Sequence, residues 1–202
     1  MKEYYGAVGY LMKAFSAVSE LTMEQVLDLA RHLFRLFALS LNLEESYFDL
    51  LTTHPDGIAR LMYYVPPTNP ILASLSTSPR EQIGLGAHSD YECFTLLLSS
   101  SVPGLEILKP SGHWHIASTP PDSFTINVAD FLMRWTNGLY KSTVHRVVNR
   151  STEARYSVPF FFSVNYDTVV ETLPTCLEQD EIGNLKEGKW KPTRRESIFW
   201  SD

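Results

Sequence analysis

Short runs of strand-forming residues follow one another along most of this 202-residue chain, and turn residues separate them. An aromatic run at 59–65 comes first, and the main series occupies residues 84–98, 104–108, 113–117, 123–128, 142–148 and 155–163. The sequence KPSGH between two of these runs is typical of a hairpin turn. Six or more short strands at such close spacing favour a sandwich or a barrel.

The first quarter of the chain has the spacing of helices instead. In LTMEQVLDLARHLFRLFALSL, residues 21–41, Thr22 with Gln25 resembles a capping box, and apolar side chains recur near helical spacing. The recurring apolar positions are Val26, Leu29, Leu33, Leu36 and Phe37, and Ser40 continues the same spacing. We also expect a helix at about 3–16 and one or two helical turns at 44–51. The sequence therefore predicts an α+β fold, mostly β, in which N-terminal helices precede an antiparallel double-sheet roll.

This reading divides the chain into three segments. We expect residues 1–55 to form a helical N-terminal segment that packs on the core, and residues 56–175 to form the β-rich core itself. Residues 176–202 would be a C-terminal extension, because the tail after Leu173 is polar and charged and has few strand signals. No internal repeat or low-complexity segment is present in the sequence.

Charge and apolar patterning disfavour several classes of protein. The formal net charge is −6, and the only basic cluster is at 189–195, which disfavours nucleic-acid binding. No stretch approaches the roughly 20 apolar residues of a membrane span, and the N-terminus lacks the apolar core of a signal peptide. The two cysteines are distant from each other, which suits a reducing compartment. We expect a soluble, cytoplasmic protein.

His88 and Asp90 place an imidazole and a carboxylate two residues apart in the run GLGAHSDYECFTLLL. In a strand, residues i and i+2 face the same side. Burying both groups is costly unless something pairs with them. They therefore either bond to each other and to the backbone or hold a shared cation. His145, in the apolar run STVHRVV, is a third candidate ligand.

Two histidines and one carboxylate have the make-up of the facial triad. That triad occupies one face of an octahedron and suits Fe(II), with three positions left open. The same donors also suit Zn²⁺ or Mn²⁺. The structural alternative is that His88 bonds to the backbone at Asp90 and that His145 is a core histidine whose two nitrogens are both satisfied.

Arg155 and Ser157, in RYSVPFFF, share one face of the last strand. A guanidinium fork beside a hydroxyl matches one terminal carboxylate, since both groups can donate hydrogen bonds to it. The alternative is a solvated edge on which Arg155 pairs with Glu153. Tyr64 has a hydroxyl that could serve the same anion, or it could be a packed core tyrosine.

The order of these motifs resembles one known family. HSD with FTLLL, then VPGLEIL, then INVADFLMRWTNGLYKSTVHRVVN, then RYSVPFFF closely resembles the 2-oxoglutarate- and Fe(II)-dependent oxygenases of the isopenicillin N synthase-like type. The resemblance covers about residues 20–175 and implies a double-stranded β-helix, or jelly roll. It also implies that His88, Asp90 and His145 hold iron inside that fold.

By the same resemblance, Arg155 and Ser157 would hold the distal carboxylate of 2-oxoglutarate, and Tyr64 would assist them. Val65 departs from the family's pattern, in which proline directly follows the two tyrosines. Strand alternation puts Phe161 on the Arg155 face, where the family has an aromatic wall. Together with Phe94 and Tyr91, such a wall suits a small and mostly apolar substrate.

The resemblance therefore implies an oxidoreductase that uses Fe(II), 2-oxoglutarate and O₂. It would hydroxylate, desaturate or cyclise a small, mostly apolar metabolite and release succinate and CO₂. Two other classes stay open. Members of the family usually carry a further N-terminal region, so one alternative is a truncated, catalytically impaired binding module. The other is an iron-dependent oxidase that does not use 2-oxoglutarate, against which the Arg155–Ser157 pair argues.

Overall fold

The computed structural model describes residues 23–67, 83–179 and 185–186. Its helices and strands are α2 (Met23–Ser40), the 3-10 helix η1 (Asp49–Thr52), β1 (Pro55–Ala59), β2 (Met62–Tyr64), β3 (Ile83–His88), β4 (Phe94–Ser99), β5 (Leu105–Leu108), β6 (Trp114–Ile116), β7 (Phe124–Val128), α4 (Asp130–Trp135), β8 (His145–Val148), β9 (Arg155–Asn165), the 3-10 helix η2 (Pro174–Cys176), β10 (Glu178–Gln179) and β11 (Leu185–Lys186). The expected helix at 3–16 and the Thr22 cap lie outside the described residues.

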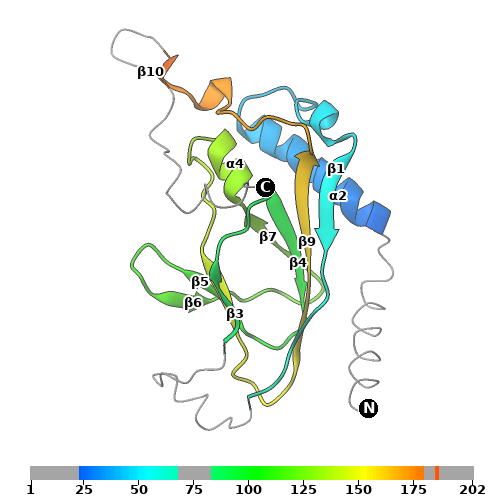
Figure 1. The fold of residues 1–202 in the computed structure, drawn as a ribbon, viewed down its shortest axis with the longest axis vertical. Coiled ribbons are helices and arrows are strands. Elements are labelled where there is room, and N and C mark those ends of the chain that lie inside the picture. Colours follow the sequence, from blue (N-terminus) through cyan, green and yellow to red (C-terminus); the bar gives the residue numbers. More distant parts are fainter. Residues whose placement is uncertain (1–22, 68–82, 180–184, 187–202) are drawn as a thin grey trace, which may run out of the picture.

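Two antiparallel sheets form the body of the fold (Figure 1). The larger sheet has the strand order β1-β9-β4-β7, and β2 also pairs with β9. The smaller sheet has the order β3-β8-β5-β6. Neighbouring strands in both sheets come from distant parts of the chain, as in β4 with β9 and β3 with β8. This arrangement confirms the predicted mostly-β, double-sheet roll with a helix ahead of it.

The main apolar core lies between α2 and the larger sheet. Figure 1 shows α2, in blue, running across the sheet that contains β4 and β9. Phe34 of α2 is in ring contact with Phe94 of β4 and Phe162 of β9, at centroid distances of 5.1 and 5.4 Å. Such aromatic pairs bury large apolar areas, so they anchor the helix on this face of the sheet. The opposite face of the same strands is left for a cavity between the two sheets.

Helix α2 buries only part of its apolar side chains. Its fully buried positions are Val26, Ala30, Phe34 and Ala38, spaced by four residues. Leu29 and Leu36, which recur at helical spacing in the sequence, are 36% and 51% exposed. The apolar face of this helix is wider than the part that the sheet covers, so packing decides which of its apolar residues are buried.

Three local features differ from the sequence prediction. The run at 84–98 is not one strand, because β3 ends at His88 and β4 begins at Phe94. Helix α4 was not expected, since its six residues are too few to show helical periodicity. The tail contains a short pairing of β10 with β11. The expected turns at 44–51 are confirmed in part by η1, and the division at 55 and 175 stays a prediction.

Among the described residues, no helix combines the length and the apolar character needed to cross a membrane.

Candidate metal centre and its cavity

His88, Asp90 and His145 come together between the two sheets. His88 is the last residue of β3 and His145 the first of β8, and the register of these strands sets the two directly opposite each other. Asp90 follows in the connection to β4, beyond the end of the strand, so the expected common strand face is wrong in detail. One possible ligand atom from each residue lies within 4.8 Å of those of the other two.

The hydrogen bonds of the two imidazoles orient them toward Asp90. His88 Nδ1 lies 2.8 Å from the carbonyl of Gly86, and His145 Nδ1 lies 2.9 Å from the carbonyl of Thr143. A carbonyl can only accept, so both Nδ1 atoms carry the proton and both Nε2 atoms are free to act as ligands. Each Nε2 lies 3.6 Å from Asp90 Oδ1, which is too long for a hydrogen bond. The sequence left two alternatives open: the side chains bond to each other and to the backbone, or they hold a shared cation. This geometry favours the shared cation.

The other oxygen of Asp90 is already satisfied. Asp90 Oδ2 accepts hydrogen bonds of 2.7 Å from Thr95 Oγ1 and from Asn127 Nδ2. Thr95 on β4 and Asn127 on β7 are cross-strand partners, so the larger sheet itself positions both donors. The sequence reasoning missed these two residues. Their only sequence signal is a polar side chain inside an otherwise apolar strand run.

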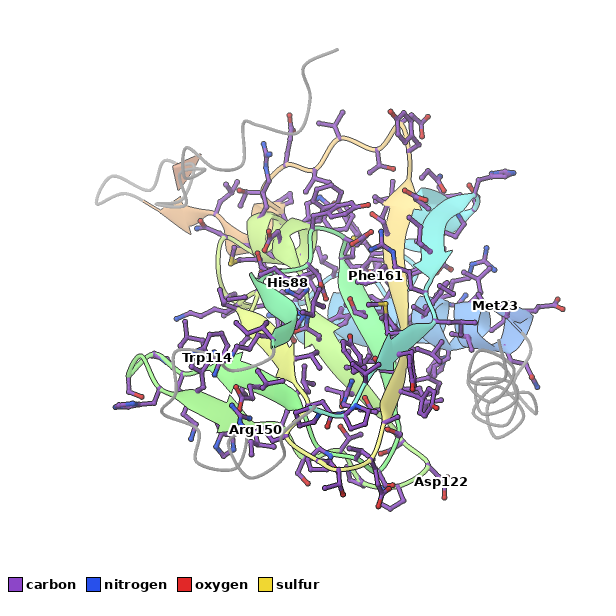
Figure 2. The ribbon with its side chains drawn as sticks, turned by 60° about the horizontal axis from the view of Figure 1, so that its bottom comes forward. Met23, His88, Trp114, Asp122, Arg150 and Phe161 are labelled. Carbon is purple, nitrogen blue, oxygen red and sulfur yellow. The ribbon has the colours of Figure 1, made fainter. Side chains whose placement is uncertain are left out.

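A cavity of about 420 Å³ opens beside the three possible ligands. Figure 2 labels His88 on β3 and Phe161 on β9, two of its lining residues, which come from different sheets. All sequence-predicted site residues except Phe94 line this cavity: His88, Asp90, His145, Tyr64, Arg155, Ser157, Phe161 and Tyr91. The roll therefore brings the three possible ligands and the arginine–hydroxyl pair to the wall of one cavity.

Arg155 is a buried cation without an anionic partner. Its side chain is 1% exposed, and Nη2 donates to Ser99 Oγ at 2.9 Å. Its Nε and Nη1 atoms have no hydrogen-bond partner within the part of the chain that the structure describes. Burial lowers the pKa of Arg155 below its ordinary value. The pairing with Glu153 that the sequence left open is absent from the described ion pairs, so the guanidinium is available to an anion.

Two glycines lie where a larger residue would collide with Arg155 or with its neighbour Tyr64. A Cβ atom on Gly104 would lie 2.9 Å from Arg155 Cδ, and one on Gly84 would lie 2.6 Å from Tyr64 Cδ1. The ring of Tyr64 packs against the guanidinium at 5.3 Å, and Tyr64 is paired with Arg155 in the sheet. Ser157 lies two residues further along the same strand and lines the same cavity.

The three expected wall residues have different positions. Phe161 lines the cavity, with the guanidinium of Arg60 5.6 Å from its ring centroid, and Tyr91 lines the cavity while 56% exposed. Phe94 is fully buried on the other face of β4, against α2. The expectation that Phe94 lines the cavity is therefore wrong. Thr95 occupies the cavity face of this strand, and neighbouring strand residues point to opposite faces.

Glu92 is a cavity residue that the sequence reasoning did not single out. Its side chain is only 4% exposed, and its Oε2 atom is buried without a hydrogen-bond partner among the described residues. Burial is the main cause that raises the pKa of Glu92. The sequence signal that could have found it is a carboxylate between Tyr91 and an apolar strand.

Comparison with known proteins gives consistent matches. The model of the 2OG-Fe(II) oxygenase superfamily matches residues 55–164. The 2-oxoglutarate-Fe(II) type oxidoreductase hxnY of Emericella nidulans is 40% identical over 77% of this chain and 43% of its own length. The homoarginine-6-hydroxylase 2-ODD-233 of Oryza sativa is 35% identical over 82% of this chain and 49% of its own length.

Solved structures match as well. A full-length protein of Neurospora crassa, crystallised in complex with alpha-KG and thymine, is 30% identical and superposes with a TM-score of 0.70, over 83% of this chain and 50% of that one. The chain thus spans about half the length of the curated relatives that it matches.

Proposed function

The chain belongs to the 2OG-Fe(II) oxygenase superfamily, and we propose that it binds Fe(II) and 2-oxoglutarate in this cavity and oxidises a small molecule there. The observation that carries the proposal is the meeting of two features in one cavity. Three possible ligand atoms converge within 4.8 Å, and a buried guanidinium without an anion lies in the same wall. A purely structural role could account for either feature alone. The two features together match a site that binds a metal ion and a dicarboxylate.

We propose His88, Asp90 and His145 as the iron ligands. In each ring Nδ1 donates to a backbone carbonyl, which leaves Nε2 as the ligand atom, and Asp90 offers Oδ1 as a single oxygen. Two imidazoles and one carboxylate, with open positions facing a cavity, suit Fe(II). When bound, iron and 2-oxoglutarate would supply the activation of O₂ that no protein side chain can provide.

We propose Arg155, Ser157 and Tyr64 as the residues that hold 2-oxoglutarate. The free Nε and Nη1 atoms of Arg155 would donate charge-assisted hydrogen bonds to its distal carboxylate. The Ser157 hydroxyl would add a further donor from the same strand face. An iron-dependent oxidase that does not use 2-oxoglutarate would leave this buried cation without a role, so the structure favours the co-substrate.

The overall reaction that we propose is hydroxylation. A C–H bond of the substrate becomes C–OH, O₂ supplies the oxygen atom, and 2-oxoglutarate is converted to succinate and CO₂. The cavity wall around Phe161 is mostly apolar, which suits a small molecule with an apolar body. Both thiols are free, which fits the reducing cytoplasm where we propose that the protein works.

Anaerobic titration tests this proposal. The protein is loaded with Fe(II) and titrated first with 2-oxoglutarate and then with pyruvate, which keeps the keto acid and lacks the distal carboxylate. We expect a visible charge-transfer band with 2-oxoglutarate at much lower concentration than with pyruvate. Oxygen is then admitted and succinate is measured. Equal affinity for the two keto acids, or no succinate, would contradict the proposal.

A further inference from the structure

Glu92 is a buried carboxylate in the wall of the cavity, and the proposed metal and co-substrate sites do not use it. Only 4% of its surface is exposed, and Oε2 has no hydrogen-bond partner among the residues that the structure describes. An unpartnered carboxylate oxygen costs free energy inside a protein, because it has lost water and gained no donor. Such an oxygen in a binding cavity calls for a partner that arrives with the ligand.

Glu92 is not a further ligand of the metal ion. The group of converging ligand atoms contains His88, Asp90 and His145 and does not include Glu92. The backbone carbonyl of Glu92 accepts a hydrogen bond from the amide of Phe131 at 3.0 Å, which ties this connection to α4. The carboxylate is therefore held next to the metal centre without belonging to it.

Glu92 lies near other carboxyl groups. Burial raises the pKa of Glu92 most, and the carboxylates of Asp90 and Asp56 raise it further, while a hydrogen bond from the Tyr91 hydroxyl lowers it. No described arginine, lysine or histidine forms an ion pair with Glu92. Among the described residues Glu92 therefore has no ion-pair partner, and Arg60, a cation of the same cavity wall, packs on the ring of Phe161.

We propose that Glu92 binds a basic nitrogen of the substrate, either an ammonium or a guanidinium group, and so holds the substrate beside the metal centre. The inference rests on the proposed function, since it concerns the same cavity. A cationic group would give Oε2 its missing donor and would neutralise the charge of Glu92. The apolar wall near Phe161 would take the rest of the molecule. The substrate class is thus a small apolar body with one basic nitrogen.

A neutral donor on the substrate is the competing explanation. A hydroxyl or an amide would also satisfy Oε2, but it would leave the negative charge of Glu92 uncompensated. The two explanations differ when a ligand loses its charge and keeps its shape. A cation site discriminates strongly between such a pair of ligands, and a site for neutral donors does not.

The test uses matched probes on the whole chain. Zn(II) replaces Fe(II) so that no turnover occurs, and calorimetric titrations are run with n-butylguanidinium, n-butylammonium, n-butylurea and n-butanol. We expect the protein to bind at least one charged probe about tenfold or more tightly than its neutral counterpart, the size of effect expected for a charge-assisted hydrogen bond. The comparison of guanidinium with ammonium identifies which basic group the site prefers.

Glu92→Gln removes the charge and keeps the shape of the side chain. We expect this variant to lose the preference for charged probes, to retain metal binding, and to melt at the same temperature as the parent or higher, because an unpartnered buried carboxylate is gone. Glu92→Asp, which keeps the charge, should retain a preference. Glu153→Gln, at an exposed position on the chain, is the matched control and should change nothing.

Two outcomes overturn the inference. One is equal binding of charged and neutral probes by the parent protein, and the other is a preference that survives in Glu92→Gln. Binding of 2-oxoglutarate is measured in parallel, and its failure would count against the proposed function alone. The preference for charged probes is also measured with the metal and without 2-oxoglutarate, so the two failures are distinguishable.

Discussion

Thr95 donates a hydrogen bond of 2.7 Å to Asp90 Oδ2 and thereby leaves only Oδ1 of this carboxylate to face the two imidazoles. Asn127 donates to the same Oδ2 atom, also at 2.7 Å. A carboxylate with one oxygen saturated in this way offers a single ligand atom in a fixed direction. Hydrogen-bond donors behind a ligand are known to affect metal binding nearly as much as the ligands themselves. The pairing of β4 with β7 therefore positions Asp90 in the proposed metal site.

Thr95→Val tests this relationship, because valine keeps the shape and removes the donor. We expect the variant to bind Fe(II) or Co(II) about 10- to 100-fold more weakly. The visible spectrum of the Co(II) form should also change, since Asn127 alone would then hold Asp90 Oδ2. Thr95→Ser, which keeps the hydroxyl, should restore both properties. Unchanged metal affinity and an unchanged Co(II) spectrum in Thr95→Val would show that the hydrogen bond does not position the ligand.

His145→Ala should abolish tight metal binding, because it removes one of the three ligand atoms that converge within 4.8 Å. The matched control is His113→Ala, which removes an exposed histidine in the turn between β5 and β6. Anaerobic equilibrium dialysis with Fe(II) measures both variants. We expect one ion per chain in the parent and in the control. Parent-like binding by His145→Ala would contradict the assignment of this residue.

Arg155→Leu should weaken 2-oxoglutarate binding by about 30- to 1000-fold, the range expected when a charge-assisted hydrogen-bonded pair is lost. Metal binding should remain, because Arg155 is not among the three converging ligand residues. Calorimetric titration of the Zn(II)-loaded variant with 2-oxoglutarate and with pyruvate measures the effect. The preference for 2-oxoglutarate over pyruvate should disappear. A variant that still prefers 2-oxoglutarate would show that another residue holds the distal carboxylate.

Phe161 and Phe162 are adjacent on β9 and face opposite sides, so they form a matched pair. Phe162 is fully buried against α2, and Phe162→Ala should reduce the free energy of unfolding by about 3 to 5 kcal/mol. Phe161 lines the cavity, so Phe161→Ala should cost less than about 3 kcal/mol, since the space beside it is already open. Urea denaturation of both variants tests this. Equal losses of stability would contradict the wall position of Phe161.

Burial raises the pKa of Cys93 to about 12, so its thiol stays protonated at neutral pH and cannot act as a nucleophile. Cys176 is only half-buried. In the native protein at pH 8 we expect a disulfide reagent to modify Cys176 quickly and Cys93 only after unfolding. Cys176→Ser should therefore show almost no native reactivity. Rapid modification of Cys93 in that variant would mean that β4 and β9 separate readily.

The periodicity of single strands was readable in the sequence. Alternation along RYSVPFFF predicted that Arg155, Ser157 and Phe161 share a face, and all three line one cavity. The order of the motifs predicted the partners His88, Asp90 and His145, which do converge. These predictions succeed because strand alternation is local and because the motif order carries the resemblance.

Tertiary structure alone decided which face of each element is covered. Alternation says that Phe94 and Thr95 point to opposite sides, but only the packing of α2 on the larger sheet sends Phe94 into the core and Thr95 into the cavity. The contact of Asn127 with Asp90 depends on the register between β4 and β7. Local spacing determines which residues share a face of a strand. Long-range packing determines whether that face contacts the core or lines the cavity.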